Sequence, residues 1–594
     1  MNRVVSRGSV LIAAAVLAAC AAKREEKDVV AQEVRKVHAP VETRMIEEAA
    51  VTGAADAAAY AEPQMQSLPV PPPVASPARD QGLASTNQVA RATSEMKMAS
   101  SRFAPPAPMM VAPNPADTER YDHQKDNGVQ LAAEQPVSTF SIDVDTGAYA
   151  NVRRFLNDGQ LPPQDAVRVE ELINYFDYDY ATPNTRDTPF RVSTELAAAP
   201  WNSQALLMRI GIKGFEAEAK ERPAANLVFL IDVSGSMDSP DKLPLLKNAF
   251  RLLTDQLTSR DRVSMVVYAG SSGVVLEPTP GNAKNEIQEA LARLSAGGST
   301  NGASGIQLAY KLAHDTLVKG GINRVVLATD GDFNVGTVDF EALVDIVERE
   351  RSTGVELTTL GFGTGNYNEK LMERLADAGN GNYAYIDTLS EARKVLVSQL
   401  SSTLYTIAKD VKIQVEFNPS EVLEYRLIGY ENRMLAREDF NNDKVDAGEI
   451  GAGHRVTALY EVIPAGAKGR VDNLRYGAQA EATVGKGELA NVRLRYKKPG
   501  SDTSQLLEYP IRKDSVADRL SADFRFAASV AAFGQLLRGG KYMGDFNYGD
   551  VTKLASGSLG ADAEGYRKEF VSLVALAKSL TPSTDASKVS QISE

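Results

Sequence analysis

Cysteine and histidine are scarce in this sequence. Its 594 residues include one cysteine, Cys20, and four histidines. A single cysteine cannot form an intramolecular disulfide, and the histidines show no metal-ligand spacing among themselves. The sequence therefore excludes a disulfide scaffold and a histidine-built metal site. The chain is nevertheless long enough to bury a sizeable hydrophobic core, and its length suggests several domains.

A surplus of basic charge is also lacking. The chain carries 65 Lys and Arg residues against 77 Asp and Glu residues, which gives a formal net charge of −12. Proteins that bind nucleic acids present basic patches that attract phosphate groups. We therefore expect no nucleic-acid partner.

Motifs of several common enzyme classes are absent too. The sequence contains no Gly-x4-Gly-Lys-Ser/Thr phosphate loop, no His-Glu-x2-His helix and no Gly-x-Ser-x-Gly elbow. No nucleophile stands beside a candidate base. We therefore predict a protein that is not an enzyme and has no catalytic residues.

The first 20 residues have the layout of a bacterial secretory signal. Arg3 and Arg7 precede an apolar run over residues 9–19, which is too short to span a bilayer. The run ends Leu-Ala-Ala-Cys, which resembles a lipoprotein signal whose cysteine is cleaved and lipid-modified. The resemblance implies a membrane anchor at Cys20 and a place in the cell envelope, at the outer membrane, facing the periplasm or the surface. The alternative is an ordinary signal peptide with an incidental cysteine.

Composition and periodicity divide the rest of the chain. A stretch rich in Ala, Pro, Gln, Glu and Ser shows no lasting apolar period, which is typical of a disordered tether. Alternating strands and helices predict an α/β fold with a doubly wound, mostly parallel sheet. Runs of alternating apolar and polar residues before and after this domain predict a β-sandwich, so the α/β domain would be inserted between strands of the sandwich. The predicted units are 1–20 signal peptide, 21–136 tether, 137–189 N-terminal helical segment, 190–225 β-hairpin of the sandwich, 226–402 α/β domain, 403–513 β-sandwich and 514–594 C-terminal helical segment capping the sandwich. Within these units, the apolar pattern predicts single helices over 389–402, 522–537 and 566–580, among others.

The stretch from Leu227 to Ser236 organises the α/β domain. Five apolar residues predict a strand buried on both faces, and Asp232, Ser234 and Ser236 follow at its carboxyl end. Ligands of open α/β sheets bind outside the carboxyl ends of the strands. The alternation lets one glycine-containing loop aim three oxygen atoms at a common point, which suits a hard cation.

Two further pieces complete the pattern, namely Gly297-Gly298-Ser299-Thr300-Asn301 before a predicted helix and Thr329-Asp330-Gly331 after a predicted strand. In residue type, order and separation, the three pieces resemble the metal-ion-dependent adhesion site of the von Willebrand factor type A domain. The wider plan of signal, tether and type A domain is similar to a family of bacterial lipoproteins that contain this domain.

This resemblance implies a set of metal ligands. Ser234, Ser236 and Thr300 would supply hydroxyl oxygens, and Asp232 and Asp330 would hold the ion directly or through water. Mg²⁺ is the expected ion and Mn²⁺ the alternative; Mg²⁺ takes six oxygen ligands and keeps water where the protein supplies too few. Two carboxylates leave such an ion under-neutralised, so it would accept an Asp or Glu side chain of a protein partner. The alternative is that these residues only cap helices and form turns.

A second, weaker metal candidate lies in residues 439–449. Asp439, Asn441 and Asp443 have the one-three-five spacing of calcium-loop ligands. Lys444 stands where the loop needs a glycine, and Ile450 where it needs a glutamate. The loop is therefore either a weak Ca²⁺ site or an acidic hairpin loop.

The sequence thus favours an envelope-anchored lipoprotein that binds a divalent cation and uses it for adhesion to an acidic group of a partner. Two other functions stay open. One is a structural scaffold whose metal only stabilises the fold, and the other is a metal-dependent hydrolase.

Overall fold

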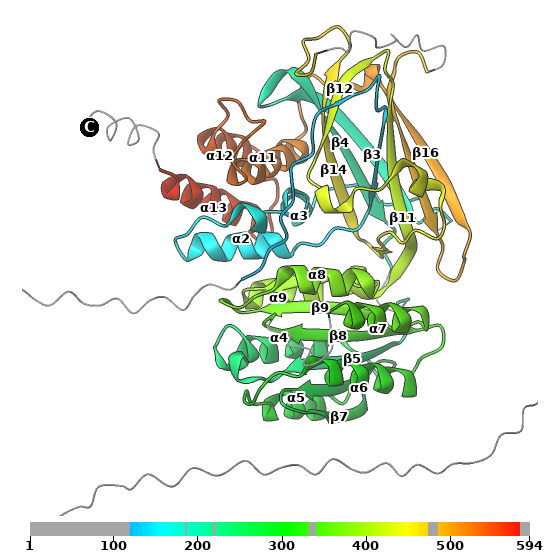
Figure 1. Cartoon of the computed structure of the whole chain (residues 1–594), viewed down its shortest axis with the longest axis vertical. Helices are drawn as coiled ribbons and strands as arrows, with labels where there is room; N and C mark the ends of the chain where they lie inside the picture. The colour runs from blue at the N-terminus through cyan, green and yellow to red at the C-terminus, as the bar shows by residue number, and fades with distance from the viewer. Residues whose placement is uncertain (1–118, 185–186, 218–220, 332–339, 473–484, 583–594) are drawn as a thin grey trace, which may run out of the picture. The chain divides into compact units, whose positions relative to one another are not determined.

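The computed structural model describes residues 119–184, 187–217, 221–331, 340–472 and 485–582. The predicted signal peptide with Cys20 and residues 21–118 of the predicted tether lie outside these ranges. The described residues form an α/β domain, a β-sandwich and a group of helices (Figure 1).

The α/β domain contains a six-stranded sheet in the order β10-β9-β8-β5-β6-β7. Neighbouring strands are parallel except β6 and β7, which form an antiparallel pair at one edge. The sheet therefore continues from β5 to β6 on one side and to β8 on the other. The strands are β5 Ala225–Asp232, β6 Arg262–Tyr268, β7 Ser272–Pro280, β8 Ile322–Thr329, β9 Glu356–Phe362 and β10 Tyr383–Ile386.

Helices cover both faces of this sheet. Phe229 and Ile231 of β5 pack in one buried layer with α4 and α5, whereas Val228 and Leu230 pack in the opposite layer with α6, α7 and α8. All eight residues of β5 are buried, which confirms the predicted strand with two buried faces. The helices are α4 Leu243–Gln256, α5 Lys284–Arg293, α6 Gly302–Asp315, α7 Phe340–Ser352, α8 Glu369–Ala378 and α9 Leu389–Arg393.

The last helix of this domain differs from the prediction of one helix over 389–402. It is divided into α9, a π-helical turn at Lys394–Ser398 and α10 Leu400–Leu404. Lys394 in this turn is buried, and its ammonium group donates to the carbonyl of Tyr175 at 2.6 Å. A π-turn changes the side-chain period locally, so the apolar pattern alone does not reveal it.

The β-sandwich consists of the sheets β1-β12-β14-β4-β3 and β13-β11-β15-β16, with β2 paired to β11. Strands β1 to β4 precede the α/β domain and the others follow it, so the domain is inserted into the sandwich as predicted. The strands are β1 Gln130–Leu131, β2 Val137–Ser141, β3 Phe190–Ala199, β4 Asn202–Gly214, β11 Thr406–Phe417, β12 Val422–Ile428, β13 Ile450–Gly451, β14 Arg455–Pro464, β15 Glu488–Lys497 and β16 Ser504–Arg512.

The chain leaves the sandwich and returns to it at one place. The rings of Phe215, just after β4, and Tyr405, just before β11, lie 6.4 Å apart between centroids.

The segment predicted as helical from residue 137 begins with the strand β2, which pairs with β11 in the sandwich. Its helices start only after this strand. That segment is therefore helical only in part.

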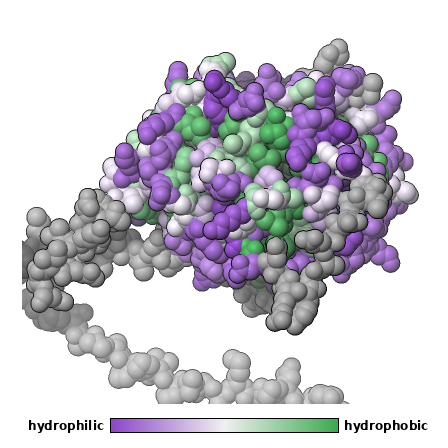
Figure 2. Space-filling model, turned by 90° about the horizontal axis from the view of Figure 1, so that it is seen from above, coloured by the Kyte–Doolittle hydropathy of each residue, from purple (hydrophilic) through white to green (hydrophobic). Residues whose placement is uncertain are grey.

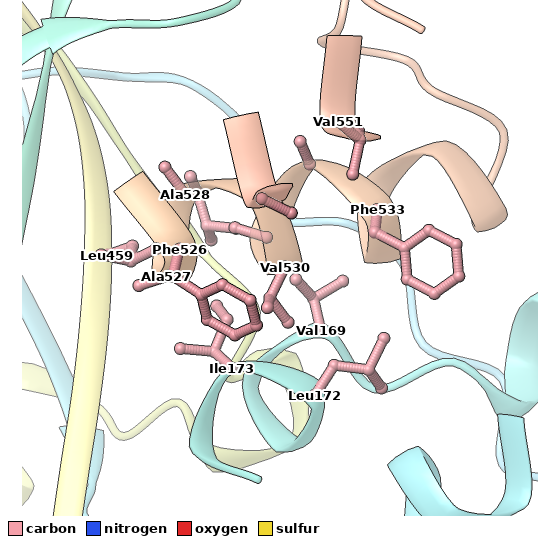
Figure 3. Packing of buried hydrophobic residues seen from close by; sticks show 14 of the residues in the cluster. Val169, Leu172, Ile173, Leu459, Phe526, Ala527, Ala528, Val530, Phe533 and Val551 are labelled. Carbon is pink, nitrogen blue, oxygen red and sulfur yellow. The ribbon is translucent and has the colours of Figure 1, made fainter. Parts of the chain in front are cut away.

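Five helices of the described residues form one buried cluster with the sheet that contains β14 and β4, and α3 lies directly against β14. Phe526, Ala527 and Val530 of α11 lie against Leu172 and Ile173 of α3, and the same buried cluster includes residues of β14 (Figure 3). α11 and α13 have the predicted bounds. The helices are α2 Gly147–Asn157, α3 Val169–Asn174, α11 Ala522–Leu537, α12 Tyr548–Ser556 and α13 Tyr566–Leu580.

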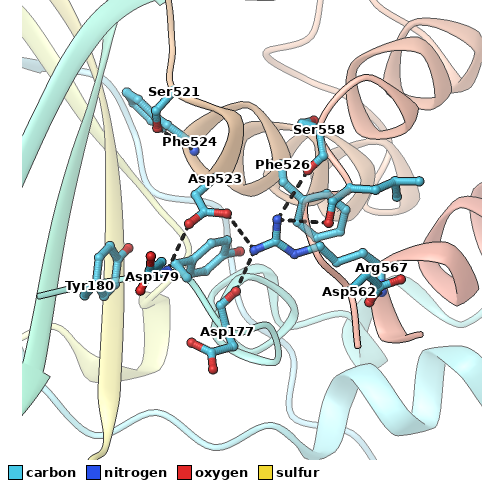
Figure 4. A network of polar contacts seen from close by, with 12 residues as sticks. Asp177, Asp179, Tyr180, Ser521, Asp523, Phe524, Phe526, Ser558, Asp562 and Arg567 are labelled. Atoms are coloured by element: carbon cyan, nitrogen blue, oxygen red, sulfur yellow. Dashed lines mark hydrogen bonds and ion pairs between the residues drawn. The ribbon is translucent and has the colours of Figure 1, made fainter. Parts of the chain in front are cut away.

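Arg567 of α13 forms hydrogen bonds with α11 and with the segment that follows α3 (Figure 4). Its Nη2 donates to the carbonyl of Asp177 at 2.6 Å and to Oδ1 of Asp523 at 2.7 Å. Oδ2 of Asp523 in turn accepts from the amide of Asp179 at 2.9 Å. One guanidinium group thus links α13, α11 and the segment after α3.

Apolar residues on the surface are dispersed. Figure 2 shows one face, on which hydrophobic residues form separate groups between hydrophilic ones. The large hydrophobic side chains that are exposed are between 38% and 46% exposed and come from different elements. Within the described ranges, no helix combines the length and apolar character needed to cross a bilayer.

Candidate metal centre

Asp232 ends β5 and is fully buried. Its Oδ1 accepts a hydrogen bond from the amide of Ser234 at 2.8 Å, and its Oδ2 accepts from the hydroxyls of Thr329 at 2.9 Å and Tyr268 at 3.2 Å. Burial raises the pKa of this carboxyl group, and the bond from the Ser234 amide opposes the rise. Because both oxygens already accept hydrogen bonds, Asp232 fits the role of holding an ion through water.

The two serines after Asp232 bring their hydroxyls together. The Oγ atoms of Ser234 and Ser236 lie 3.0 Å apart. Ser234 is buried and Ser236 is exposed. The pair therefore converges on one point beside solvent, as the alternating pattern predicts.

The loop that carries Thr300 lies directly against this serine loop. The amide of Gly235 donates to the carbonyl of Gly298 at 3.0 Å, and the amide of Gly297 donates to the carbonyl of Val233 at 2.8 Å. Gly298 has a φ of +85°, a left-handed conformation that favours glycine. These bonds bring the half-buried Thr300, just before α6, to the same edge of the sheet as Ser234.

Asp330 completes the predicted set and is fully buried at the carboxyl end of β8. Since β8 pairs in parallel with β5, the two aspartates follow neighbouring strands at one edge. Oδ2 of Asp330 accepts from the Nζ atom of Lys242 at 2.9 Å and from the side-chain amide of Asn366 at 3.2 Å. The structure thus brings the loops of all five predicted ligands together at this edge.

Lys242 and Asn366 are the residues that sequence reasoning missed. Lys242 stands at the start of α4, and Asn366 stands in the loop after β9. Lys242 ends the connection from β5 to α4 and Asn366 lies in the connection after β9, which is a signal that places both near the sheet edge where Asp232 lies. Nothing in the sequence around them indicates that they contact Asp330.

The donor set fits a small hard cation. The groups at this edge are hydroxyl and carboxylate oxygens, which Mg²⁺ and Mn²⁺ prefer over nitrogen or sulfur ligands. Lys242 adds a positive charge next to one of the two carboxylates. Metal binding by Asp232, Ser234, Ser236, Thr300 and Asp330 remains a prediction that the geometry favours.

The predicted calcium loop contacts the chain's own cations. Asn441 accepts a hydrogen bond from Arg495, and the carbonyls of Asp439 and Asp443 accept from the ammonium groups of Lys412 and Lys497. Of the predicted side-chain ligands, Asn441 is thus occupied by Arg495, and two lysines lie against backbone carbonyls of the same loop. Calcium binding by Asp439, Asn441 and Asp443 stays a prediction, and the structure does not favour it.

The described residues contain two further clusters of three carboxylates, which were not predicted as metal sites. In each cluster the carboxylates lie close enough together to hold an ion. The clusters are Asp143 with Asp145 and Asp377, and Asp410 with Asp446 and Glu449. In both clusters the chain supplies counter-charges. Arg433 pairs with all three acids of the first, and Lys497 and Arg351 pair with Asp410 and Asp446 of the second. The first cluster is therefore explained by internal ion pairs. In the second, Arg351 and Lys497 pair with Asp446 and Asp410 but not with Glu449, whose Oε1 is buried without a hydrogen-bond partner.

Comparison with known proteins gives three family matches. Residues 226–399 match the von Willebrand factor type A domain, residues 115–209 match a family described as von Willebrand factor, and residues 402–580 match the C-terminal part of the uncharacterized protein YfbK. The match over residues 226–399 confirms the predicted resemblance to the von Willebrand factor type A domain.

Among whole proteins, the uncharacterized protein YfbK of Escherichia coli is 49% identical over 475 residues, covering 78% of this chain and 82% of its own length. The uncharacterized protein sll0103 of Synechocystis is 31% identical over 199 residues, covering 33% of this chain and 45% of its own length. Inter-alpha-trypsin inhibitor heavy chain H3 of Mesocricetus auratus is 26% identical over 40% of this chain and 28% of its own length.

Solved structures include a von Willebrand factor type A protein from Catenulispora acidiphila, 16% identical, with a TM-score of 0.38 over 67% of this chain and 91% of that one. Another is the conserved hypothetical protein BatB from Bacteroides thetaiotaomicron, 21% identical, with a TM-score of 0.27 over 30% of this chain and 98% of that one.

Proposed function

Because this chain belongs to the family of YfbK and carries a von Willebrand factor type A domain, we propose that it is a cell-envelope binding protein. It holds Mg²⁺ or Mn²⁺ at the metal-ion-dependent adhesion site and uses the ion to bind an Asp or Glu side chain of a protein partner. The observation that carries this proposal is the meeting of three loops, with Asp232, the two serines, Thr300 and Asp330, at one edge of the sheet.

The residues have distinct parts in this function. Ser234, Ser236 and Thr300 supply hydroxyl oxygens to the ion, while Asp232 and Asp330 supply negative charge from buried positions. When bound, the ion supplies a positive centre that can accept one more oxygen ligand. The proposed role is one of binding, and a metal-dependent hydrolase is the less favoured alternative.

The first experiment is a pull-down from an envelope extract of the bacterium that produces the protein. The chain without its signal peptide serves as bait in Mg²⁺, in chelator, and as the variants Asp232→Ala and Asp330→Ala. We expect a partner that is retained only by the unmutated protein in Mg²⁺, because each variant should lose about 10- to 100-fold in metal affinity.

The control variant is Asp255→Ala, an exposed acid on α4 that should retain the partner as the parent does. Retention of the same proteins in chelator and by both site variants would contradict ion-mediated adhesion. That result would favour the scaffold function, in which the metal only stabilises the fold.

We also propose that Cys20 anchors the protein to the membrane through a lipid. Replacing Cys20 by Ala should move the protein from the membrane fraction to the soluble fraction, since acyl chains provide the membrane affinity in such an anchor. Fractionation of cells followed by immunoblotting measures this shift. An unchanged membrane fraction for the variant would contradict the lipid anchor.

A further inference from the structure

Lys242 contacts one of the two carboxylates of the candidate metal site. Its side chain is 8% exposed, and its Nζ atom lies 2.9 Å from Oδ2 of Asp330 and 3.1 Å from Oδ1 of Asn366. The amide of Asn366 donates to the same oxygen of Asp330. Lysine, asparagine and aspartate thus form a closed triangle of polar contacts on one of the two carboxylates.

This position of the lysine is built into the fold. The backbone of Lys242 is fixed at the start of α4, where its amide donates to the carbonyl of Ser239 and its carbonyl accepts from the amide of Leu246. Gly363 has a φ of +75°, and a Cβ atom there would lie 2.3 Å from the lysine's methylene carbons. The glycine therefore leaves room for the lysine stem, which points its ammonium group at Asp330.

The charges at the site lead to a specific inference. The carboxylates of Asp232 and Asp330 would just neutralise a divalent cation, but the ammonium group of Lys242 leaves the loaded centre with a net charge of +1. We propose that Lys242 lowers the affinity of the centre for its cation and makes tight binding depend on an anionic ligand from the partner. This inference rests on the proposed function and specifies its regulation.

The physical reason is that like charges repel strongly in a buried site, where neither water nor salt screens them well. A cation must share Asp330 with the ammonium group or displace it. A carboxylate from the partner restores neutrality to the centre. Cation and partner should therefore bind cooperatively, each raising the affinity for the other by the same factor.

The test is isothermal titration calorimetry of the full chain without its signal peptide, with MgCl2 and separately with MnCl2. The proteins are the parent, Lys242→Met and Lys242→Gln, each measured with and without sodium acetate as a carboxylate probe. We expect both variants to bind Mg²⁺ about tenfold more tightly than the parent. Acetate should raise the affinity for Mg²⁺ more in the parent than in either variant.

A matched control is Lys247→Met, on the same helix. The ammonium group of Lys247 donates to the carbonyls of Ala292 and Leu294 rather than to Asp330, so its loss should leave metal affinity unchanged. Thermal unfolding gives a second readout, since added Mg²⁺ should raise the Tm of both Lys242 variants more than that of the parent.

Equal or weaker Mg²⁺ binding by the variants, with binding retained by the parent, would overturn this inference alone and make Lys242 a residue that positions Asp330. Absence of Mg²⁺ and Mn²⁺ binding by the parent would instead overturn the proposed function. Circular dichroism checks the fold of each variant. The glutamine variant keeps a hydrogen-bond donor for Asp330, so it decides the question if the methionine variant does not fold.

Discussion

Replacing Arg433 by Met should lower the free energy of unfolding by about 3–5 kcal/mol, the cost of leaving buried charges without their partner. The guanidinium group of Arg433 is 9% exposed and contacts four carboxylates. They are Asp143 at 3.1 Å, Asp145 at 3.2 Å, Glu373 at 2.9 Å and Asp377 at 2.6 Å.

These acids come from two different parts of the structure. Asp143 and Asp145 lie between β2 and α2, whereas Glu373 and Asp377 lie on α8 of the type A domain. Arg433 itself follows β12 of the sandwich, in the 3-10 turn Glu431–Arg433. One side chain therefore joins the type A domain to the sandwich electrostatically, and its loss should affect the stability of both.

Denaturation in urea, followed by circular dichroism and tryptophan fluorescence, measures this effect. Arg433→Lys should cost less than Arg433→Met, because lysine keeps the charge and loses only the forked geometry. The control is Arg374→Met on α8, whose partner Glu341 is largely exposed, so the change should be small. Equal stability of Arg433→Met and the parent would show that the four acids are protonated or solvated without the arginine.

Replacing Glu369 by Gln should make the protein more stable at pH 8 to 9 and flatten the dependence of its stability on pH. Glu369 is 1% exposed at the start of α8, and neither of its carboxylate oxygens has a hydrogen-bond partner. Burial raises its pKa from 4.5 to about 8; Arg168 opposes the rise, whereas Glu373, Glu170 and Glu119 add to it.

The direction of the pH dependence follows from this pKa. The folded state holds the proton more tightly than the unfolded state, so the protonated carboxyl group favours folding fully below about pH 4.5. That contribution is lost as the pH rises through about 8. Each pKa unit of difference corresponds to about 1.4 kcal/mol, so the loss amounts to a few kcal/mol by pH 9.

Urea denaturation at a series of pH values between 5 and 9 measures the slope for the parent and for Glu369→Gln. Asp377, whose pKa burial raises to about 7, should contribute to the slope that remains in the variant. Glu289→Gln, an exposed position on α5, is the control and should follow the parent. Parallel curves for the parent and Glu369→Gln would contradict a buried, protonated Glu369.

Local patterns in the sequence predicted much of the fold. The apolar run of β5 and the helical periods of α11 and α13 are properties of contiguous residues, so their positions are close to those expected. The insertion of the α/β domain followed from the change of period on either side of it. The loops that carry Asp232, Thr300 and Asp330 were found because each is a short motif at a strand or helix end.

Long-range contacts account for what the sequence did not predict. Lys242, at the start of α4, contacts Asp330, which follows β8, and Arg433, which follows β12, contacts Asp143. The partners in each pair lie far apart in the sequence, so neither contact produces a local sequence pattern. α12 is short and has only two buried residues, which gives a weak helical period. The exposed strand β16 was also not predicted individually, since half of its residues face solvent irregularly.

The close approach of Phe215 and Tyr405 has a consequence for the order of folding. β4 pairs with β14, although the whole type A domain lies between them in the sequence. Joining these strands in an unfolded chain means closing a very long loop, at an entropic cost that grows with loop length. Once the inserted domain has folded, its two ends are adjacent and the loop that must close is shorter by the length of that domain. We therefore expect the sandwich to assemble on a type A domain that is already formed.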